Sequence, residues 1–227
     1  REIRKKNPNF INLCLNEKLA SEITLQPIQR FDLDAAIIFS DILMLPYGLG
    51  QNIEFIKNFG PKLGELNLDD IDKINEIDFV KKLDPVYKAI RKVSINPIQK
   101  SKNTIGFVGA PWTLLVYMIN QQSPKKELKK NFFKDEFYIN KILLIIEKFL
   151  KVHIKNQIDS GANVIQIFDS WAGLLEKKHL SKYIYAPTLN LVNYIKSLNT
   201  PVICFPREIK NYIEFCEIIK PDAISID

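Results

Sequence analysis

Three polar side chains follow apolar segments of the chain, at positions where they could take part in chemistry. Asp41 comes directly after the apolar run AAIIFS, Ser170 follows the run NVIQIF by one residue, and Tyr117 lies six residues after Pro111. In parallel α/β folds the functional side chains gather at the carboxyl ends of the strands, because the loops there converge on one face. Asp41, Tyr117 and Ser170 are therefore the candidate site residues.

Asp41 is the strongest of the three. A carboxylate placed straight after an apolar strand, with Ile42 and Leu43 behind it, is expected to be partly shielded from water. While it stays ionised, it would be a strong hydrogen-bond acceptor or a stabiliser of positive charge. An aspartate that caps a helix or a turn is about as common at such a position, so the local sequence leaves both interpretations open.

Tyr117 and Ser170 carry weaker signals. A helix that begins near Pro111 would place Tyr117 on the same face as Thr113 and Leu114, directed either at the mouth of a barrel or at the core. The simpler interpretation is that Tyr117 is a core residue whose hydroxyl is hydrogen-bonded within the protein. A serine at a strand-to-helix turn is more often a cap than a nucleophile, and no Gly-x-Ser-x-Gly sequence surrounds Ser170.

Other chemistries lack their usual residues. The two histidines, His153 and His179, lie in a helical pattern and in a polar stretch, where packing or surface roles are expected. The three cysteines, Cys14, Cys204 and Cys216, are widely and irregularly spaced, with no Cys-x-x-Cys pair, which favours a reduced, cytoplasmic compartment and predicts no metal site. No His-Glu-x-x-His, Walker or Gly-x-Gly-x-x-Gly motif occurs.

The elements that would position these residues alternate between strands and helices. Five short apolar runs are typical of buried strands: residues 35–40, 104–109, 163–168, 201–205 and 222–226. Helical patterns lie between them, over about 135–159, 181–198 and 208–219, with Gly161 in the position of a C-terminal cap. The interval 43–103 contains a possible hairpin and a polar helical stretch. This alternation predicts a parallel sheet, either open and doubly wound or part of a closed barrel.

Composition favours a soluble globular chain. The 227 residues are 46% hydrophobic, and the run from Ile142 to Ile146 is far shorter than the roughly 20 residues that cross a bilayer. The net charge of +6 comes from scattered lysines, so we expect neither a nucleic-acid nor a membrane partner. Without a repeat or a flexible linker, residues 1–227 are expected to form a single domain.

Three long strings resemble signature stretches of the uroporphyrinogen decarboxylase family, and they occur in that family's order. They are LQPIQRFDLDAAIIFSDILMLPYGLG, IGFVGAPWTLLVYM and QIFDSWAG. The resemblance implies an α/β fold of the (β/α)8 TIM-barrel class, present here as a truncated barrel of about strands 2–6. It also implies a homodimer and a carboxy-lyase that uses no metal or organic cofactor. Its substrate would be uroporphyrinogen III, converted to coproporphyrinogen III by loss of carbon dioxide from four acetate side chains.

The resemblance also implies roles for the three candidates. Asp41 would be the catalytic carboxylate that binds the pyrrole N–H groups at the centre of the macrocycle, while Tyr117 and Ser170 would contact the substrate's carboxylates or line the pocket. The ring becomes cationic during decarboxylation, so a fixed anion beneath it stabilises charge that develops as the reaction proceeds.

The chain departs from the family pattern at both ends. The family's Arg-rich segment lies just before Arg1 and its active-site histidine lies beyond Asp227, so neither belongs to these residues. We therefore expect the 227-residue chain on its own to fold poorly and to be inactive.

Two other functions remain as alternatives. A zinc-dependent corrinoid methyltransferase of the same fold would need thiolate and imidazole ligands, but Val202 stands where a His-x-Cys arrangement ending at Cys204 would place histidine. A non-catalytic tetrapyrrole-binding module would have kept the pocket and lost the chemistry.

Overall fold

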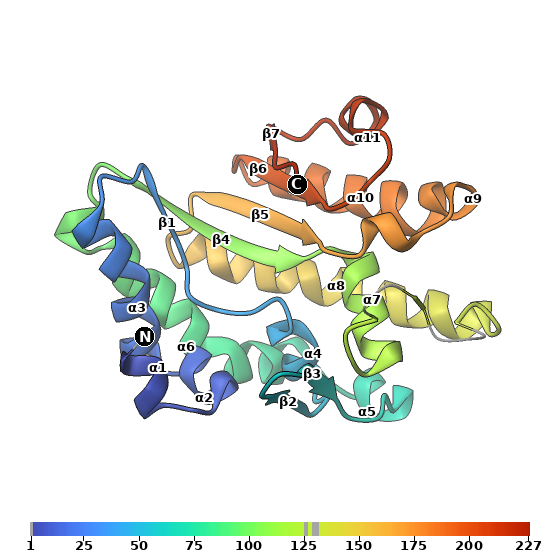
Figure 1. Ribbon diagram of the computed structural model, residues 1–227, viewed down its shortest axis with the longest axis horizontal. Coiled ribbons are helices and arrows are strands. Elements are labelled where there is room, and N and C mark those ends of the chain that lie inside the picture. Colours follow the sequence, from blue (N-terminus) through green and yellow to red (C-terminus); the bar gives the residue numbers. More distant parts are fainter. Residues whose placement is uncertain (1, 125–126, 129–131) are drawn as a thin grey trace.

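A five-stranded parallel sheet forms the centre of the computed structural model, which describes residues 2–124, 127–128 and 132–227. Its strands lie side by side in the order β1-β4-β5-β6-β7, and every neighbouring pair is parallel (Figure 1). Their bounds are β1 Ala35–Ile37, β4 Asn103–Gly109, β5 Val164–Asp169, β6 Val202–Pro206 and β7 Ala223–Ile224. All five strand predictions are confirmed. Because spatial order follows chain order, each unit adds its strand on the same side of the last, as in a barrel.

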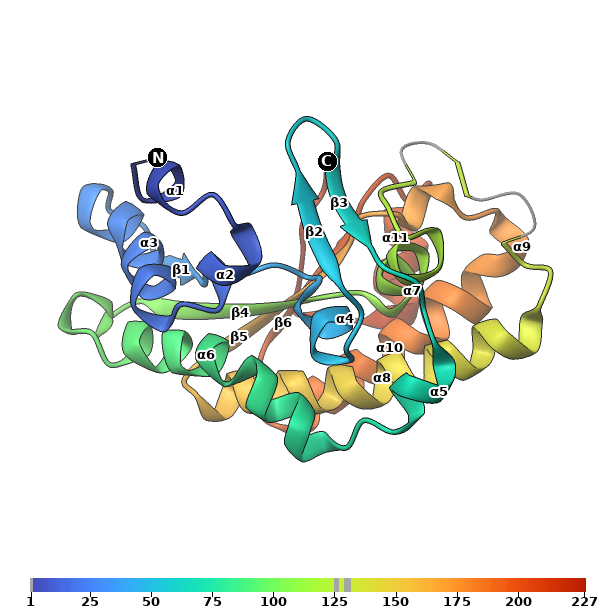
Figure 2. The ribbon, with the colours of Figure 1, turned by 90° about the horizontal axis from the view of Figure 1, so that it is seen from below.

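Helices connect the strands. The α-helices are α1 Glu2–Lys6, α2 Phe10–Cys14, α3 Glu17–Arg30, α4 Met44–Gly48, α5 Leu68–Asp72, α6 Glu76–Ser94, α7 Pro111–Asn120, α8 Glu136–Asp159, α9 Lys177–Leu180, α10 Ala186–Ser197 and α11 Tyr212–Ile219. Short turns η1 Pro97–Gln99, η2 Ala172–Leu174 and η3 Ser181–Tyr185 complete the described set. Helices α6, α8 and α10 lie next to one another along one face of the sheet (Figure 2).

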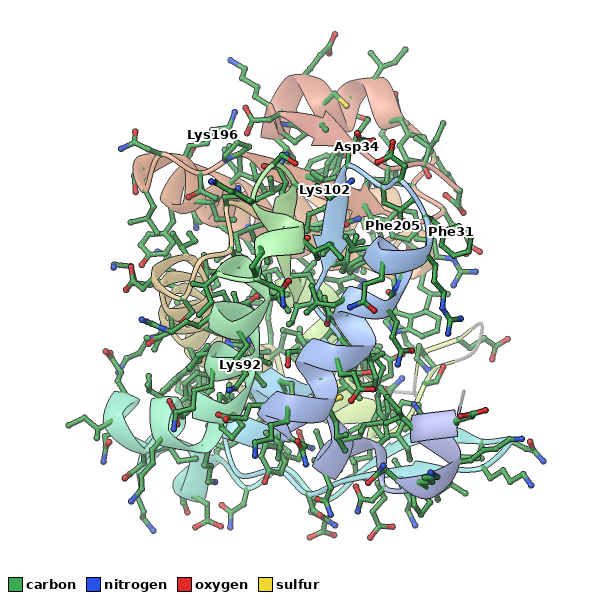
Figure 3. The ribbon with its side chains drawn as sticks, turned by 90° about the vertical axis from the view of Figure 1, so that its left-hand side faces the viewer. Phe31, Asp34, Lys92, Lys102, Lys196 and Phe205 are labelled. Atoms are coloured by element: carbon green, nitrogen blue, oxygen red, sulfur yellow. The ribbon has the colours of Figure 1, made fainter. Side chains whose placement is uncertain are left out.

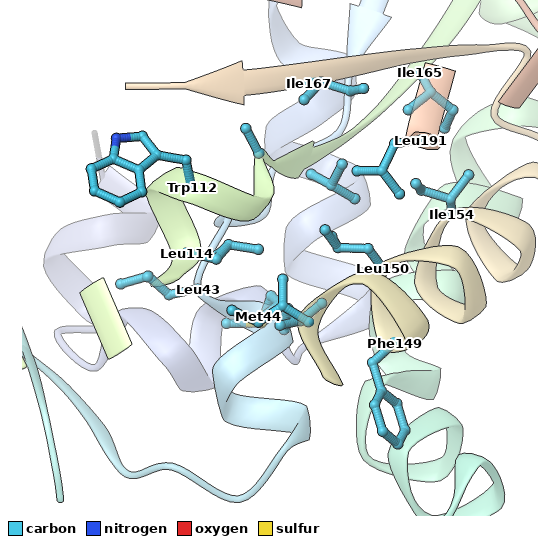
Figure 4. Close-up of a cluster of buried hydrophobic side chains, with 14 of the residues drawn as sticks. Leu43, Met44, Trp112, Leu114, Phe149, Leu150, Ile154, Ile165, Ile167 and Leu191 are labelled. Atoms are coloured by element: carbon cyan, nitrogen blue, oxygen red, sulfur yellow. The ribbon is translucent and has the colours of Figure 1, made fainter. Parts of the chain in front are cut away.

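The core lies between this helical layer and the sheet. Ile165 and Ile167 of β5 are buried towards α8 and α10, where they meet Leu150, Ile154 and Leu191 (Figure 4). Side chains alternate along a strand, so Phe168 is directed to the opposite face. Burial of the apolar stripe of α8 is what fixes the sheet on its helices.

The opposite face of the sheet carries a row of aromatic rings. Phe107, Phe168 and Phe205 come from three adjacent strands, and their rings meet edge to face with centroids 5.5 Å and 6.1 Å apart. All three are only partly buried. In a (β/α)8 fold this face is the inside of the barrel.

The two ends of the sheet differ in character. At the amino ends, Lys102 forms an ion pair with Asp32 at 3.0 Å and donates to the Leu33 carbonyl oxygen. Figure 3 views the molecule from this side, with Asp34 and Lys102 labelled. The opposite, carboxyl ends lead into α7 and the loops that hold the candidate residues (Figure 1).

The predicted hairpin is also confirmed. Strands β2 (Ile53–Ile56) and β3 (Gly60–Leu63) pair antiparallel, and the Leu63 N–H donates to the Gln121 carbonyl at 2.7 Å. Gln121 is the left-handed C-cap of α7, so the hairpin packs on the end of that helix.

Two helix boundaries differ from the prediction. The helix expected from 181 begins earlier, with α9, and widens into the π-helical turn η3 before α10. The helix expected from 208 begins at Tyr212, because Glu208 has a φ of 59° and the Asn211 side chain accepts from the Glu214 N–H as the N-cap. Predicted packing roles for the histidines are confirmed: His153 is buried and bonded to the Tyr87 hydroxyl at 2.9 Å, and His179 stacks on Phe133.

Candidate active site

The carboxyl ends of β1, β4, β5 and β6 bring four segments together, which we call the carboxyl rim: Asp41, helix α7, residues 170–173 and Arg207. Strand register aligns them. Gly109 at the end of β4 pairs with Phe168, and Asp169 at the end of β5 pairs with Pro206. The prediction that functional candidates follow the strand ends therefore places Asp41, Tyr117 and Ser170 on one edge of the sheet.

Asp41 is a shielded carboxylate at this rim. Its Oδ1 accepts a 2.8 Å hydrogen bond from the Leu43 N–H, which closes a local turn before α4. Burial raises the pKa of the Asp41 carboxyl to about 6, and the bond from Leu43 opposes that rise. No lysine or arginine in the described ranges forms an ion pair with it. Asp41 thus makes the turn that its sequence allowed, and it also presents a negative charge with no basic partner there.

Tyr117 lies on α7, close enough to Asp41 for the carboxylate charge to affect the pKa of its phenol. Burial raises the pKa of the Tyr117 phenol, the negative charge of Asp41 raises it further, and the Arg207 guanidinium lowers it. The Tyr117 ring meets the Trp171 ring edge to face, with centroids 5.7 Å apart. The start of α7 at Pro111 is confirmed, with proline in the first turn. Tyr117 is half-buried, so it lies at the boundary between the core and the rim.

A second carboxylate, Asp169, lies beneath the rim. Its side chain is 3% exposed, and its Oδ1 accepts a 2.7 Å hydrogen bond from the Thr113 hydroxyl. That hydroxyl in turn accepts from the Trp171 N–H at 3.1 Å. Burial raises the pKa of the Asp169 carboxyl to about 7, while the Thr113 and Trp171 donors oppose the rise.

The loop after β5 holds Ser170 and Trp171 above this carboxylate. Ser170 is half-buried, and no hydrogen bond in the described part of the chain joins its side chain to Asp41 or Tyr117. Trp171 is better anchored, since its carbonyl accepts from the Trp112 indole N–H at 2.9 Å. Of the three predicted site residues, the structure therefore brings Asp41 and Tyr117 together and leaves Ser170 beside them.

Arg207 is a rim residue that the sequence analysis missed. It follows β6, its side chain is exposed, and its guanidinium lies 3.2 Å from Glu208. Its backbone N–H donates to the Asp169 carbonyl, and its carbonyl accepts from the Gly173 N–H, so the β5 and β6 exits are tied together. The residue's position two residues after the apolar run PVICF was the available signal.

Two of the three thiols, those of Cys14 and Cys204, are buried. Burial raises the pKa of the Cys14 thiol to about 12. Burial also raises the pKa of the Cys204 thiol, and the negative charge of Asp169 adds to that rise. Within the described ranges, no group of three or more His, Cys, Asp or Glu side chains is arranged to hold a metal ion. No helix found there is both long and apolar enough to cross a membrane.

The fold is shared with a solved structure of different sequence. A methyltransferase from Methanosarcina mazei superimposes with a TM-score of 0.70 over 93% of this chain and 70% of that chain, at 15% sequence identity. At that identity the likeness concerns the fold alone.

Sequence comparison is more specific. The family model for uroporphyrinogen decarboxylase (URO-D) matches residues 1–227. A uroporphyrinogen decarboxylase from Campylobacter jejuni is 41% identical over 219 residues, which are 94% of this chain and 64% of the relative. One from Rickettsia bellii is 38% identical over 99% of this chain and 67% of the relative. The chain thus spans about two thirds of the length of these relatives. It belongs to the uroporphyrinogen decarboxylase family, whose fold is the TIM barrel.

Proposed function

We propose that the whole protein is a uroporphyrinogen decarboxylase, a carboxy-lyase that removes carbon dioxide from the four acetate side chains of uroporphyrinogen III to give coproporphyrinogen III. The observation that carries the proposal is Asp41: a shielded carboxylate without a basic partner in the described ranges, beside Tyr117 on the carboxyl rim. The relatives named above support the same reaction. Residues 1–227 would belong to a single barrel domain.

The proposed role of Asp41 is electrostatic. In the reduced macrocycle the pyrrole N–H groups converge on the ring centre, where a single carboxylate can accept several of them. Protonation of a pyrrole carbon makes the ring cationic, and the bond between the acetate methylene and its carboxylate then breaks. Carbon dioxide leaves and the electron pair returns to the ring system. A proton added to the methylene carbon completes the methyl group, and loss of the proton first added to the ring carbon restores the pyrrole, so one proton is consumed for each carbon dioxide released. A fixed anion favours the cationic stage over the neutral ground state.

The raised pKa of Asp41 is compatible with this role. With a pKa of about 6 the carboxyl is mostly ionised above pH 7, and hydrogen bonds from pyrrole N–H groups would stabilise the anion further. Because it starts without a basic partner in the described part of the chain, its charge is not already neutralised. We therefore assign Asp41 as a ligand and charge stabiliser.

Tyr117 and Ser170 are proposed to contact the substrate. The Tyr117 ring and Trp171 together form an aromatic wall at the rim, which suits the flat face of a pyrrole. Ser170 precedes Trp171 on the same loop and is half-buried. Arg207 supplies an exposed guanidinium suited to the carboxylates of the substrate.

The test is turnover by the whole protein. Anaerobic incubation with uroporphyrinogen III should give products that have lost one to four molecules of carbon dioxide, resolved by mass spectrometry after oxidation to the porphyrins. Tight binding without any such product would support a non-catalytic tetrapyrrole module instead. Stoichiometric zinc in the purified protein, together with transfer of a methyl group to or from a corrinoid, would support the methyltransferase alternative.

The state of assembly and the location are proposed on the family resemblance. We infer a cytoplasmic homodimer with no nucleic-acid or membrane partner. Light scattering on the purified whole protein tests the dimer, and fractionation of the cells that make it tests the location.

A further inference from the structure

The buried Asp169 carboxylate takes no part in the reaction proposed above, yet it lies directly beneath the rim. The Thr113 hydroxyl that donates to it and the Trp171 N–H that donates to that hydroxyl belong to segments far apart in the sequence. Thr113 lies in the first turn of α7, and Trp171 lies in the loop after β5. The carboxylate is therefore placed where the two segments that carry Tyr117 and Ser170 meet.

The hydrogen bonds form a continuous chain. The Trp171 N–H donates to the Thr113 hydroxyl oxygen at 3.1 Å, and that hydroxyl donates its proton to Asp169 Oδ1 at 2.7 Å. Asp169 fixes the direction of the Thr113 proton, because a carboxylate oxygen accepts and leaves the hydroxyl lone pairs to face Trp171. Thr113 is fully buried, so no bulk water competes for either bond.

Two additional bonds hold the same loop. The Trp112 indole N–H donates to the Trp171 carbonyl at 2.9 Å, and the Arg207 N–H donates to the Asp169 carbonyl at 3.1 Å. The residues on both sides of Ser170 are thus tied to α7 or to β6. The chain of bonds ends at the Trp171 backbone N–H, and the ring of the same residue contacts the Tyr117 ring.

The second oxygen of Asp169 points to a purpose other than stability. Oδ2 is buried and has no hydrogen-bond partner in the described part of the chain. A buried polar atom without a partner costs free energy. An apolar residue at position 169 would avoid that cost but could not orient the Thr113 hydroxyl.

We propose that Asp169 is a positioning residue for the decarboxylation, acting through Thr113 to hold the Ser170–Trp171 loop against α7 and so to fix the Trp171 ring relative to Tyr117. This inference rests on the proposed function for the reaction it serves. Asp169 itself touches no substrate, because its side chain lies beneath the rim residues.

The experiment varies the hydroxyl and keeps the side-chain volume. Thr113→Val removes the donor to Asp169 and the acceptor for Trp171, whereas Thr113→Ser restores both. In the whole protein, Thr113→Val should lower kcat by about 10- to 100-fold with KM changed by less than about 3-fold, as expected for misplaced groups around a bound substrate. Thr113→Ser should return kcat to within about 3-fold of wild type, because the hydroxyl is restored. Thr188→Val, at a threonine of similar burial in α10, is the matched control and should leave kcat unchanged.

A spectroscopic measurement separates failure of this inference from failure of the proposed function. The protein is labelled with 5-fluorotryptophan, and Trp171→Phe identifies the fluorine resonance of Trp171. That resonance should shift in Thr113→Val and return to its wild-type position in Thr113→Ser, whatever reaction the protein catalyses. An unmoved resonance with wild-type kcat in Thr113→Val would overturn the positioning role. A wild-type protein that does not decarboxylate uroporphyrinogen would instead refute the proposed function.

Asp169→Asn covers the case in which Thr113→Val does not fold. The amide oxygen can still accept from Thr113, so the Trp171 resonance should stay near its wild-type position. Asp169→Leu, of similar size, should displace it. Equal spectra for Asp169→Asn and Asp169→Leu would contradict the inference.

Discussion

The edge of the Tyr117 ring meets the Trp171 ring at a centroid distance of 5.7 Å, and this contact joins α7 to the loop that follows β5. Burial raises the pKa of the Tyr117 phenol, and the nearby negative charge of Asp41 raises it further. An aromatic surface and an anion therefore adjoin at the carboxyl rim. That combination suits a substrate with a flat, electron-rich ring system and acidic N–H groups.

Two substitutions of Tyr117 distinguish the role of its hydroxyl from the role of its ring contact with Trp171. Tyr117→Phe keeps the ring against Trp171 and removes only the hydroxyl, so we expect a loss of about 3- to 10-fold in kcat/KM, the size of one hydrogen bond. Tyr117→Leu also removes the ring contact and should lose more. Steady-state kinetics on the whole protein measure both changes. Equal losses in the two variants would mean that the ring has no role of its own.

Arg207 is predicted to act on substrate binding. Its guanidinium is exposed at the rim, so Arg207→Gln should raise KM for the carboxylate-rich substrate about 10-fold, with kcat changed little, because a charge-assisted bond to a carboxylate is lost. Added salt should weaken substrate binding by the wild type more than by the variant. Lys92→Gln serves as the charge-matched control (Figure 3). Lys92 lies on α6, distant in sequence from Arg207, and forms an ion pair with Glu17. A KM that is the same in wild type and Arg207→Gln would remove Arg207 from the site.

Asp41 is predicted to reduce the stability of the protein at neutral pH. Its pKa in the folded protein is about 6, above the ordinary value of 3.8, so the folded state holds the proton more tightly than the unfolded state. The free energy of unfolding is therefore highest below the ordinary pKa of 3.8. It falls as the pH rises through about 6, by at most about 3 kcal/mol in total. Asp41→Asn removes this loss.

Denaturant unfolding at several pH values measures the effect. Asp41→Asn should gain stability over the wild type progressively between about pH 4 and pH 6, and the gain should level off above about pH 7. Asp34→Asn, at an exposed aspartate at the amino end of the sheet, is the control (Figure 3). A constant difference between wild type and Asp41→Asn across this range would show that the Asp41 carboxyl is not shielded as described.

Much of the fold could be predicted because its strands are short apolar runs bounded by polar residues. The five runs and the hairpin are confirmed, as is the helix that begins at Pro111. The boundaries that failed depend on features without a local apolar pattern. The φ of 59° at Glu208 delays α11, and no local apolar pattern marks the π-helical turn before α10.

The candidate residues could be predicted where they follow a strand or lie in a helix with a local signal. Asp41 directly follows the run 35–40, and Tyr117 lies in the helix that begins at Pro111. The roles of Asp169 and Arg207 could not be predicted in this way, because they depend on the register that aligns β5 with β6, which is set by contacts between residues distant in sequence. A polar residue such as Thr113 inside an apolar helix gives no local indication that its partner lies 56 residues further on.

The central claim is that Asp41 stabilises the cationic stage of a decarboxylation. The most direct test is kcat for uroporphyrinogen III with Asp41→Asn in the whole protein, beside the binding affinity of the same variant for the substrate. The variant should bind within about 10-fold of wild type, while kcat falls by at least about 100-fold, as for loss of a preorganised charge at the reacting centre. Equal kcat values for the wild type and Asp41→Asn would contradict the claim.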